Sequence, residues 1–268
     1  MSAETIDLSG RVALVTGGGR GIGRAVALAL GRAGAAVAVN YRRDEDAAAQ
    51  VVKDITAAGG TAGAYPASVG DLDALDGLVA AVAADLGPID ILVNNAGMAS
   101  RGQSVVDTDP AELPRLMAVN ALGPHRLAQL VLPAMRTRPR GDIVFISSAD
   151  VTRLSANGAP YNMGKAAMEA LAFTLAKEER PHGVHVNVVA PGLVATDMGE
   201  RLVAAKVGTT IGDLDARYPF GRVCIPDDVA GAVLFLVSGL AGYVTGQRIG
   251  VDGGLDHDPV LSGTAAAG

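Results

Sequence analysis

The chain has 268 residues, of which 49% are hydrophobic, and its formal net charge is −6 at pH 7. These values suit one α/β domain with a sizeable core, and the lack of a basic run argues against nucleic acid and anionic membranes as partners. No apolar run reaches the roughly 18 residues of a membrane span, and the first residues lack the pattern of a signal peptide, so we expect a cytoplasmic protein.

The cysteine and histidine residues do not indicate a metal site. Cys224 is the only cysteine, which leaves no intramolecular disulfide and no thiolate cluster. The histidines show no ligand spacing relative to carboxylates, and they stand at His125, His182, His185 and His257. We therefore expect no bound metal.

Short apolar segments alternate with helical patterns along the chain. Strands are expected at about 12–16, 36–40, 63–65, 89–93, 142–147, 184–189 and 247–251. Helices are expected at about 21–34, 44–58, 72–86 and 110–135, followed by one that carries Tyr161. Continuous apolar strands joined by helices predict a parallel sheet covered on both faces. The prediction is a single α/β domain with a doubly wound, Rossmann-type sheet of seven parallel strands, a core at about 9–254 and a mobile tail at about 258–268.

A glycine-rich segment joins the first strand to the first helix. It reads Thr16-Gly17-Gly18-Gly19-Arg20-Gly21-Ile22-Gly23, a T-G-x-x-x-G-x-G spacing. Glycines let the backbone approach a pyrophosphate, and the helix N-terminus offers N–H groups to that anion. The alternative is a tight turn without a ligand. The position between a strand and a helix favours a dinucleotide phosphate loop.

The end of the second strand indicates the cofactor. A carboxylate there would bind the ribose of NAD, but the chain has Asn40-Tyr41-Arg42-Arg43. Arg20 and Arg42 could grip a 2′-phosphate, because guanidinium groups match phosphate geometry. NADPH is therefore the expected cofactor, with NADH as the alternative. In the competing interpretation, the arginines only open the next helix as solvated charges.

Tyr161 and Lys165 stand four residues apart, which places them on one face of a helix. A phenol has an ordinary pKa of about 10. A nearby ammonium favours the phenolate and brings that pKa towards the working range. The pair is a candidate proton-transfer device, although this spacing also occurs by chance in many helices.

Together these and other motifs resemble the single-domain branch of the short-chain dehydrogenase/reductase family, from about Ser9 to Gly254. The order of the motifs is typical of that family, and they are the glycine loop, Asn94-Asn95-Ala96-Gly97, Asn120, Ser148 before the Tyr161/Lys165 pair, Pro191-Gly192 with Thr196, and Val251-Asp252-Gly253-Gly254. The sequence segments 186–198 and 244–247 are most similar to those of 3-oxoacyl-carrier-protein reductases and related ketoreductases.

The resemblance implies a role for each motif residue. Tyr161 would donate the proton in carbonyl reduction, and Lys165 would lower the pKa of Tyr161 and contact the nicotinamide ribose. Ser148 would bind the carbonyl oxygen, and Asn120 would hold a relay water. The implied cofactor contacts are Gly17, Gly19, Arg20, Gly21, Ile22, Gly23, Asn40, Tyr41, Arg42, Ser68, Val69, Asn94, Ala96, Gly97, Tyr161, Lys165, Pro191, Gly192, Val194 and Thr196.

The chain departs from the family pattern in three places. Ser68-Val69 replaces the usual Asp-Val that touches adenine, so the contact is expected to weaken modestly. Gly164 stands where Ser often precedes the catalytic lysine, which suggests a close backbone approach. Asp150 and Arg153 lie between Ser148 and Tyr161, facing either substrate or solvent.

The expected function is NADPH-dependent reduction of a ketone, such as a 3-oxoacyl thioester, to a secondary alcohol. The alternatives are a sugar or secondary-alcohol dehydrogenase that works oxidatively, and a non-catalytic dinucleotide-binding regulator. The substrate is expected to be a small molecule, free or linked to a carrier protein or CoA. A lid is expected at about 199–221, and the resemblance implies a homotetramer. The apolar side chains of that lid are expected to contact either the substrate or the protein body and a neighbouring subunit.

Overall fold

The structure, a computed structural model, describes residues 6–255 and 258. Apart from Asp258, the predicted tail at 258–268 lies outside the described residues. Among the described residues, no helix is both long and apolar enough to cross a lipid bilayer.

Seven parallel strands form one sheet, in the order β3-β2-β1-β4-β5-β6-β7. The strands are β1 (Val12–Val15), β2 (Ala36–Tyr41), β3 (Thr61–Pro66), β4 (Ile91–Asn94), β5 (Gly141–Ile146), β6 (Val184–Pro191) and β7 (Arg248–Val251). The predicted sheet is confirmed. Its apolar strands are almost fully buried at the centre because helices cover both faces.

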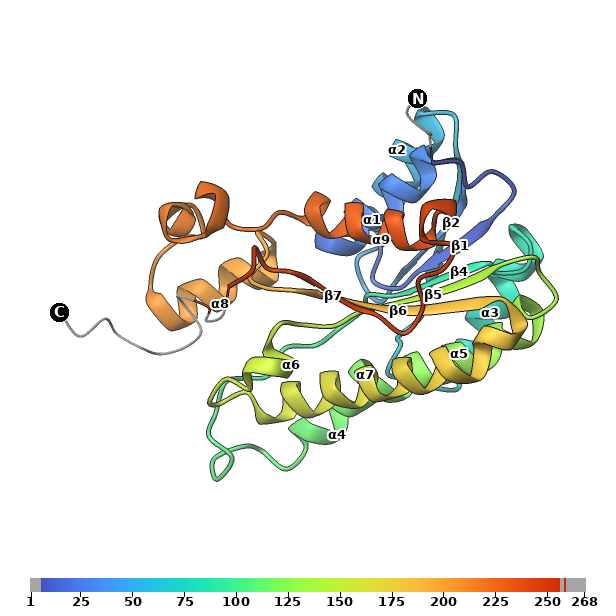
Figure 1. The fold of residues 1–268 in the computed structure, drawn as a ribbon. Coiled ribbons are helices and arrows are strands. Elements are labelled where there is room, and N and C mark those ends of the chain that lie inside the picture. The colour runs from blue at the N-terminus through green and yellow to red at the C-terminus, as the bar shows by residue number, and fades with distance from the viewer. Residues whose placement is uncertain (1–5, 256–257, 259–268) are drawn as a thin grey trace.

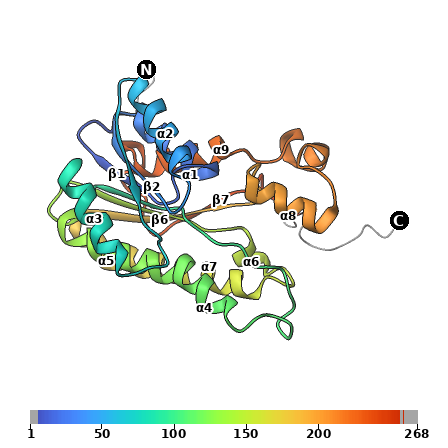
Figure 2. The ribbon, with the colours of Figure 1, turned by 180° about the vertical axis from the view of Figure 1, so that it is seen from behind.

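Two groups of helices cover the two faces of the sheet (Figures 1 and 2). One face packs on α1 (Gly21–Arg32), α2 (Glu45–Ala57) and α9 (Pro226–Val237). The other packs on α3 (Ala74–Asp85), α5 (Gly123–Met135) and α7 (Ala159–Glu179). Each group shares an aliphatic cluster with the strands, so the core is two apolar layers separated by the sheet.

Three helical features were not predicted correctly. The helix expected at 110–135 is divided into α4 (Glu112–Met117), a π-helical turn η1 (Ala118–Leu122) and α5. The sequence prediction also lacked α8 (Asp197–Val207) and α9. Helix α9 has clear start signals, since Pro226 is its first residue and Asp228 accepts a hydrogen bond from the amide of Ile225 (2.9 Å).

The order of the strands fixes where a ligand can bind. The chain passes from β1 outwards to β3 and then returns to the other side of β1 with β4. In such sheets ligands bind at this switch point, beyond the carboxyl ends of the strands. The short helix α6 (Asp150–Arg153) and α8 follow β5 and β6 at that end of the molecule (Figure 1).

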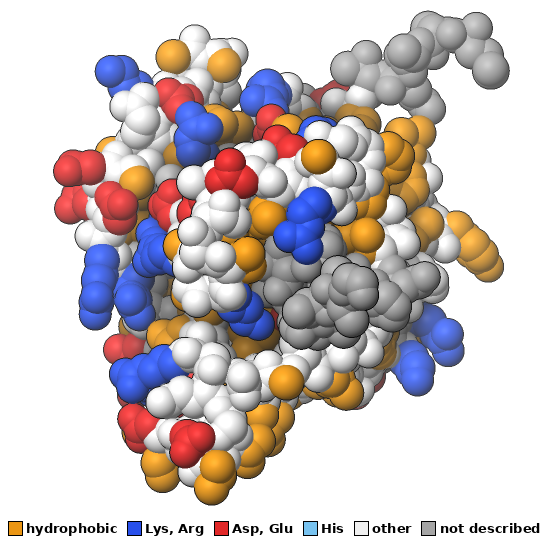
Figure 3. Space-filling model, turned by 90° about the vertical axis from the view of Figure 1, so that its left-hand side faces the viewer, with side chains coloured by type: hydrophobic (Ala, Val, Ile, Leu, Met, Phe, Trp, Pro, Cys, Tyr) orange, Lys and Arg blue, Asp and Glu red, His pale blue; other side chains and the backbone are white. Residues whose placement is uncertain are grey.

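The segment predicted as a lid comprises most of α8 and two 3-10 turns, η3 (Gly212–Arg217) and η4 (Pro219–Gly221). It has its own small core, in which Val203, Ile211 and Tyr218 pack with Leu193 and Val223. Phe220 is 89% exposed and adopts a left-handed backbone conformation, φ +60°. The structure thus divides the apolar residues of this segment into an internal core and an exposed remainder, and Figure 3 shows apolar and charged side chains mixed over this side of the molecule.

Candidate active site

The glycine loop is held in place by side chains from the ends of β1 and β4. Asn95 donates through Nδ2 to the carbonyls of Thr16 (2.8 Å) and Gly17 (3.2 Å). The Thr16 hydroxyl in turn accepts from the amides of Asn95 and Ala96, both at 3.0 Å. Thr16 and Asn95 were quoted in the motifs but were not predicted as site residues. Their position at the carboxyl ends of adjacent strands was the available signal.

The loop geometry fits a pyrophosphate. Gly17 and Gly21 have positive φ values of 62° and 52°, which glycine adopts without strain. A Cβ on Gly23 would overlap the carbonyl oxygen of Gly17, so the start of α1 can lie this close to the loop only with glycine. Helix α1 begins at Gly21, and its N-cap residue Arg20 makes no side-chain cap, which leaves the first N–H groups of the helix available to an anion.

Two further observations indicate that a ligand bound at the glycine loop could also contact the ends of neighbouring strands. The amide side chain of Asn94 is 2% exposed, and neither its Nδ2 nor its Oδ1 has a hydrogen-bond partner in the structure. Buried polar groups are normally paired, so an unpaired amide beside the loop fits a ligand contact. A Cβ on Gly21 would lie 3.3 Å from Cγ2 of Thr196, so the glycine loop and the Pro191–Thr196 segment are adjacent.

The residues predicted to select the cofactor occupy different environments. Asn40 is 1% exposed, and its side chain bonds backbone groups of Gly17 and Tyr65, so it supports the loop. Arg20 lies 3.8 Å from the carboxylate of Asp197, and both side chains are exposed. Arg42 is exposed at the end of β2. Arg42 directly follows β2, the strand whose end is expected to lie near the ribose.

The other predicted cofactor residues follow the strand ends. Val69 is 7% exposed and packs under α5, where a Cβ on Gly123 would overlap its carbonyl oxygen. Ser68 is partly exposed. Pro191 ends β6 beside Val251, and the amide of Gly192 donates to the Val251 carbonyl (3.2 Å).

The predicted catalytic residues converge from β5, α7 and η1. Lys165 is 4% exposed, and its Nζ donates to the carbonyl of Ile146 at the end of β5 (2.7 Å). Nζ lies 6.0 Å from the centre of the Tyr161 ring. The Tyr161 hydroxyl also forms a hydrogen bond with the side chain of Ser148. The sequence spacing therefore corresponds to a real cluster.

Asn120 joins this cluster from the π-helical turn. It is fully buried, and its side chain accepts from the amide of Met98 (2.9 Å) and donates to the Met98 carbonyl (3.1 Å). A Cβ on Gly97 would lie 3.4 Å from Nζ of Lys165 and 3.5 Å from Oδ1 of Asn120. A Cβ on Gly164 would lie 3.1 Å from Cβ of Asn120. The expected close approach at Gly164 is therefore confirmed, and it arises where α7 packs against the turn that carries Asn120.

The ionisation of the Tyr161/Lys165 pair differs from the prediction. Burial raises the pKa of Tyr161 to about 12; the hydrogen bond with Ser148 lowers it, and the charge of Asp150 raises it. Burial lowers the pKa of Lys165 to about 8, against the attraction of Glu169. The net shift of the Tyr161 pKa is therefore opposite to the expected one, because desolvation dominates at both groups and the ammonium of Lys165 is bound to the Ile146 carbonyl.

The structure also places the two charges that precede Tyr161. The carboxylate of Asp150 accepts from the Ser155 hydroxyl (2.9 Å), and its backbone amide donates to Oγ of Ser148 (3.1 Å). Arg153 is engaged by the protein, since it donates to Asp252 (2.7 Å) and its side chain is only 13% exposed. Asp150 thus lies beside Ser148, one of the predicted catalytic residues, while Arg153 ties this loop to the end of β7.

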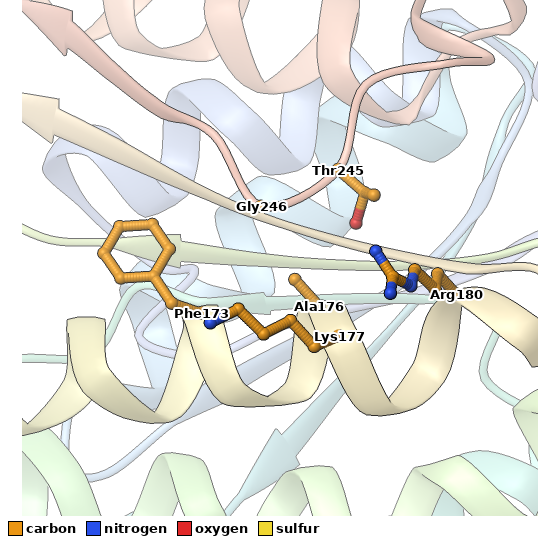
Figure 4. A pocket seen from close by; sticks show the side chains of 6 residues that line it. All are labelled: Phe173, Ala176, Lys177, Arg180, Thr245 and Gly246. Atoms are coloured by element: carbon orange, nitrogen blue, oxygen red, sulfur yellow. The ribbon is translucent and has the colours of Figure 1, made fainter.

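A separate pocket of about 460 Å³ lies along the second half of α7 (Figure 4). Its lining residues come from α7, its C-terminal end and the loop before β7, and they are Phe173, Ala176, Lys177, Arg180, Thr245 and Gly246. The nearest of them is eight residues beyond Lys165, or about 12 Å along a helix. The pocket is therefore distinct from the predicted catalytic cluster.

Known proteins share both this sequence and this fold. A family profile described as Enoyl-(Acyl carrier protein) reductase matches residues 17–256. The 3-oxoacyl-[acyl-carrier-protein] reductase of Synechocystis sp. is 38% identical, over 92% of this chain and 98% of its own. The chain belongs to the short-chain dehydrogenase/reductase family. The resemblance inferred from the motifs is confirmed.

Solved structures of the family agree. The angucycline C-6 ketoreductase LanV with bound NADP superposes with a TM-score of 0.83, at 37% identity, covering 92% of this chain and 96% of that one. A 7α-hydroxysteroid dehydrogenase complexed with NADH and 7-oxo glycochenodeoxycholic acid gives 0.86, at 33% identity, covering 95% and 97%. The protein is accordingly an NAD(P)-dependent oxidoreductase acting on CH–OH and C=O groups. The alternative of a non-catalytic regulator is removed.

Proposed function

We propose that this short-chain dehydrogenase/reductase reduces a ketone to a secondary alcohol with NADPH. The observation that carries the proposal is the cluster of Tyr161, Lys165 and Ser148 at the same sheet edge as a loop that fits a pyrophosphate. The reduced nicotinamide supplies the hydride when it is bound. The chain's own side chains handle the proton and the developing charge on the carbonyl oxygen.

Tyr161 is the proposed proton donor. A phenol is protonated at neutral pH even at its ordinary pKa of about 10, as a general acid requires. Ser148 orients the carbonyl oxygen by a hydrogen bond, and Lys165 offers an ammonium to the phenolate that remains after proton transfer. Asn120 holds the loop at Met98 next to Lys165, which fits a role in a proton route to solvent. The reverse sequence of proton movements describes alcohol oxidation.

The preference for NADPH rests on Arg42 and on the absence of a carboxylate at the end of β2. NADH stays the alternative. We further propose a 3-oxoacyl thioester or a related ketone as substrate, supported by the similarity to the Synechocystis reductase and to LanV. The alternative is a sugar or secondary-alcohol dehydrogenase that works oxidatively.

The lid is part of this proposal. The α8–η4 segment follows Thr196 directly, so it lies next to the place proposed for the nicotinamide. Its internal core makes it a preformed unit, and this core leaves the side chains of Val207 and Phe220 exposed for a substrate or a neighbouring subunit.

The proposal is tested with a substrate panel. Purified protein is mixed with acyl thioesters, cyclic ketones, quinones and sugars, and oxidation of NADPH or NADH is followed by absorbance. We expect turnover of a ketone with NADPH at a higher kcat/KM than with NADH. Reduction of NADP by sugars or secondary alcohols, without ketone reduction at any pH, would favour the oxidative alternative.

We also propose that the protein forms a homotetramer. Strand β7 is the last strand of the described sheet and pairs there only with β6. Nearby, Leu240 and Tyr243 expose apolar side chains, 54% and 104% of their reference surfaces. A partner's strand and helices would cover such an edge. Light scattering coupled to size-exclusion chromatography should give about four times the chain mass of 27.0 kDa; a monomeric mass would contradict the proposal.

A further inference from the structure

An ion pair with a buried carboxylate and a partly exposed guanidinium lies directly behind the proposed catalytic cluster. Glu169 follows Lys165 by one helical turn on α7, and its side chain is 8% exposed. Arg248, the first residue of β7, approaches both carboxylate oxygens through Nε, at 3.1 and 3.2 Å. The two residues are 79 positions apart in the sequence and meet because β6 and β7 lie over α7.

The pair extends to Ser147 and Ser148, which directly follow β5. The hydroxyl of Ser147 donates to Oε1 of Glu169 (2.5 Å). Nη2 of Arg248 donates to the backbone carbonyl of Ser148 (2.9 Å). The network thus joins α7, the end of β5 and the start of β7, and it contacts Ser148 at its backbone carbonyl, whereas Asp150 contacts the hydroxyl of Ser148.

The same network sets the charge around Lys165. Burial disfavours the ammonium, and Glu169 is the charged group that opposes this effect. From the other elements, Asp150 of α6 acts on Tyr161, and Arg248 of β7 partly neutralises Glu169. The carboxylate and the guanidinium therefore act on Lys165 with opposite signs.

Stability alone does not account for these residues. A buried ion pair recovers little more than its own desolvation, and apolar side chains of similar volume often serve equally well. Here Arg248 donates a hydrogen bond to the proposed catalytic serine, Ser148, and the charge of Glu169 acts on the proposed catalytic lysine, Lys165. A role in the site explains why both partners are charged.

We propose that Glu169 and Arg248 are positioning residues of the catalytic site: the carboxylate keeps the ammonium of Lys165 charged, and the guanidinium fixes the strand end that bears Ser148. The inference rests on the proposed function of Tyr161, Lys165 and Ser148. It predicts opposite effects of the two residues on the titration of Lys165, which a merely structural pair would not produce.

The first experiment needs no turnover. The chain has four lysines, so side-chain ¹³C labelling of lysine gives few NMR signals, and Lys165→Met identifies the one of interest. We expect the midpoint of the Lys165 pH titration to fall in Glu169→Gln and to rise in Arg248→Gln, each by at least about half a pH unit. Glu179→Gln is the matched control, because Glu179 is a buried carboxylate on α7 that pairs with Arg136, away from Lys165.

The second experiment is kinetic. With the best ketone, Glu169→Gln should move the alkaline decline of kcat to lower pH, and Glu169→Asp should restore part of the wild-type profile. Arg248→Gln should raise the KM for the ketone severalfold and leave the KM for NADPH within about twofold, with partial rescue in Arg248→Lys.

The outcomes separate the inference from the proposed function. Midpoints of Lys165 that move in the same direction in both variants, or in neither, overturn the inference even if ketones are reduced. If Glu169→Gln does not fold, an unchanged or lowered midpoint in Arg248→Gln overturns it. Opposite shifts without any ketone reduction by the wild type support the positioning of Lys165 and refute the proposed function.

Discussion

The glycine loop and helix α7, which carries the proposed catalytic residues Tyr161 and Lys165, are built by different physical means. The loop depends on its backbone, namely glycines with positive φ and a helix start without a side-chain cap. The side chain of Asn95 holds this backbone in place by hydrogen bonds to its carbonyls. The part of α7 that faces the site depends instead on buried polar side chains, and burial shifts the pKa values of Tyr161 and Lys165. The comparison teaches that the loop should be sensitive to added volume, whereas the helix should be sensitive to lost charges and hydroxyls.

The largest effect is expected at the hydroxyl of Tyr161. Tyr161→Phe should lower kcat for ketone reduction on the order of 10²–10⁴-fold, because the general acid is lost. NADPH binding, followed by fluorescence titration, should stay close to the wild-type value. Tyr243→Phe, at a fully exposed position, is the control. Substantial residual reductase activity in Tyr161→Phe would show that another group supplies the proton.

Added volume in the glycine loop is expected to produce the next largest effect. Gly23→Ala places a Cβ against the carbonyl of Gly17 and the amide of Asn95, so the loop must move. We expect the Kd for NADPH to rise by more than about tenfold, a cost of at least about 1.4 kcal/mol. Gly77→Ala is the control, since a Cβ there on α3 meets nothing within 4 Å. Unchanged binding by Gly23→Ala would mean that the loop does not hold the pyrophosphate.

Arg42 tests the one charged contact proposed at the loop. Arg42→Ala should raise the KM for NADPH about tenfold, the typical weight of a charge-assisted hydrogen bond, and leave the KM for NADH nearly unchanged. Arg32→Ala removes an exposed charge at the other end of α1 and should affect neither cofactor. Equal losses for NADPH and NADH in Arg42→Ala would contradict a 2′-phosphate contact.

The smallest effect concerns pH and the buried charge of Lys165. Its pKa is about 8 in the folded protein and 10.5 ordinarily, so between these values the unfolded chain binds more protons. Stability relative to Lys165→Met should therefore rise with pH, by about 1 kcal/mol between pH 7 and 9. Urea denaturation of both proteins at several pH values measures this difference. A difference that falls with pH would mean that Lys165 is more strongly stabilised as the ammonium than its burial suggests.

Much of the fold was predictable because its signals are local. The apolar strands, the glycine loop and the helical spacing of Tyr161 and Lys165 are fixed by neighbouring residues and backbone preferences. Helix α9 was missed although Pro226 and Asp228 mark its start. The π-helical turn around Asn120 was missed for another reason. Its sequence, Ala118–Leu122, looks like any helix, and the glycines that lie against it, Gly164 and Gly97, come from distant parts of the chain.

The sequence by itself determined the sheet, the place of the phosphate loop, the family and the candidate catalytic residues. The tertiary structure decided what surrounds them. It paired Glu169 with Arg248, turned Asn40 into a brace for the loop, tied Arg153 to Asp252 and raised the pKa of Tyr161 rather than lowering it. The reason is physical: backbone conformation depends on residues nearby in the chain, whereas desolvation and charge depend on every element that the fold brings into contact.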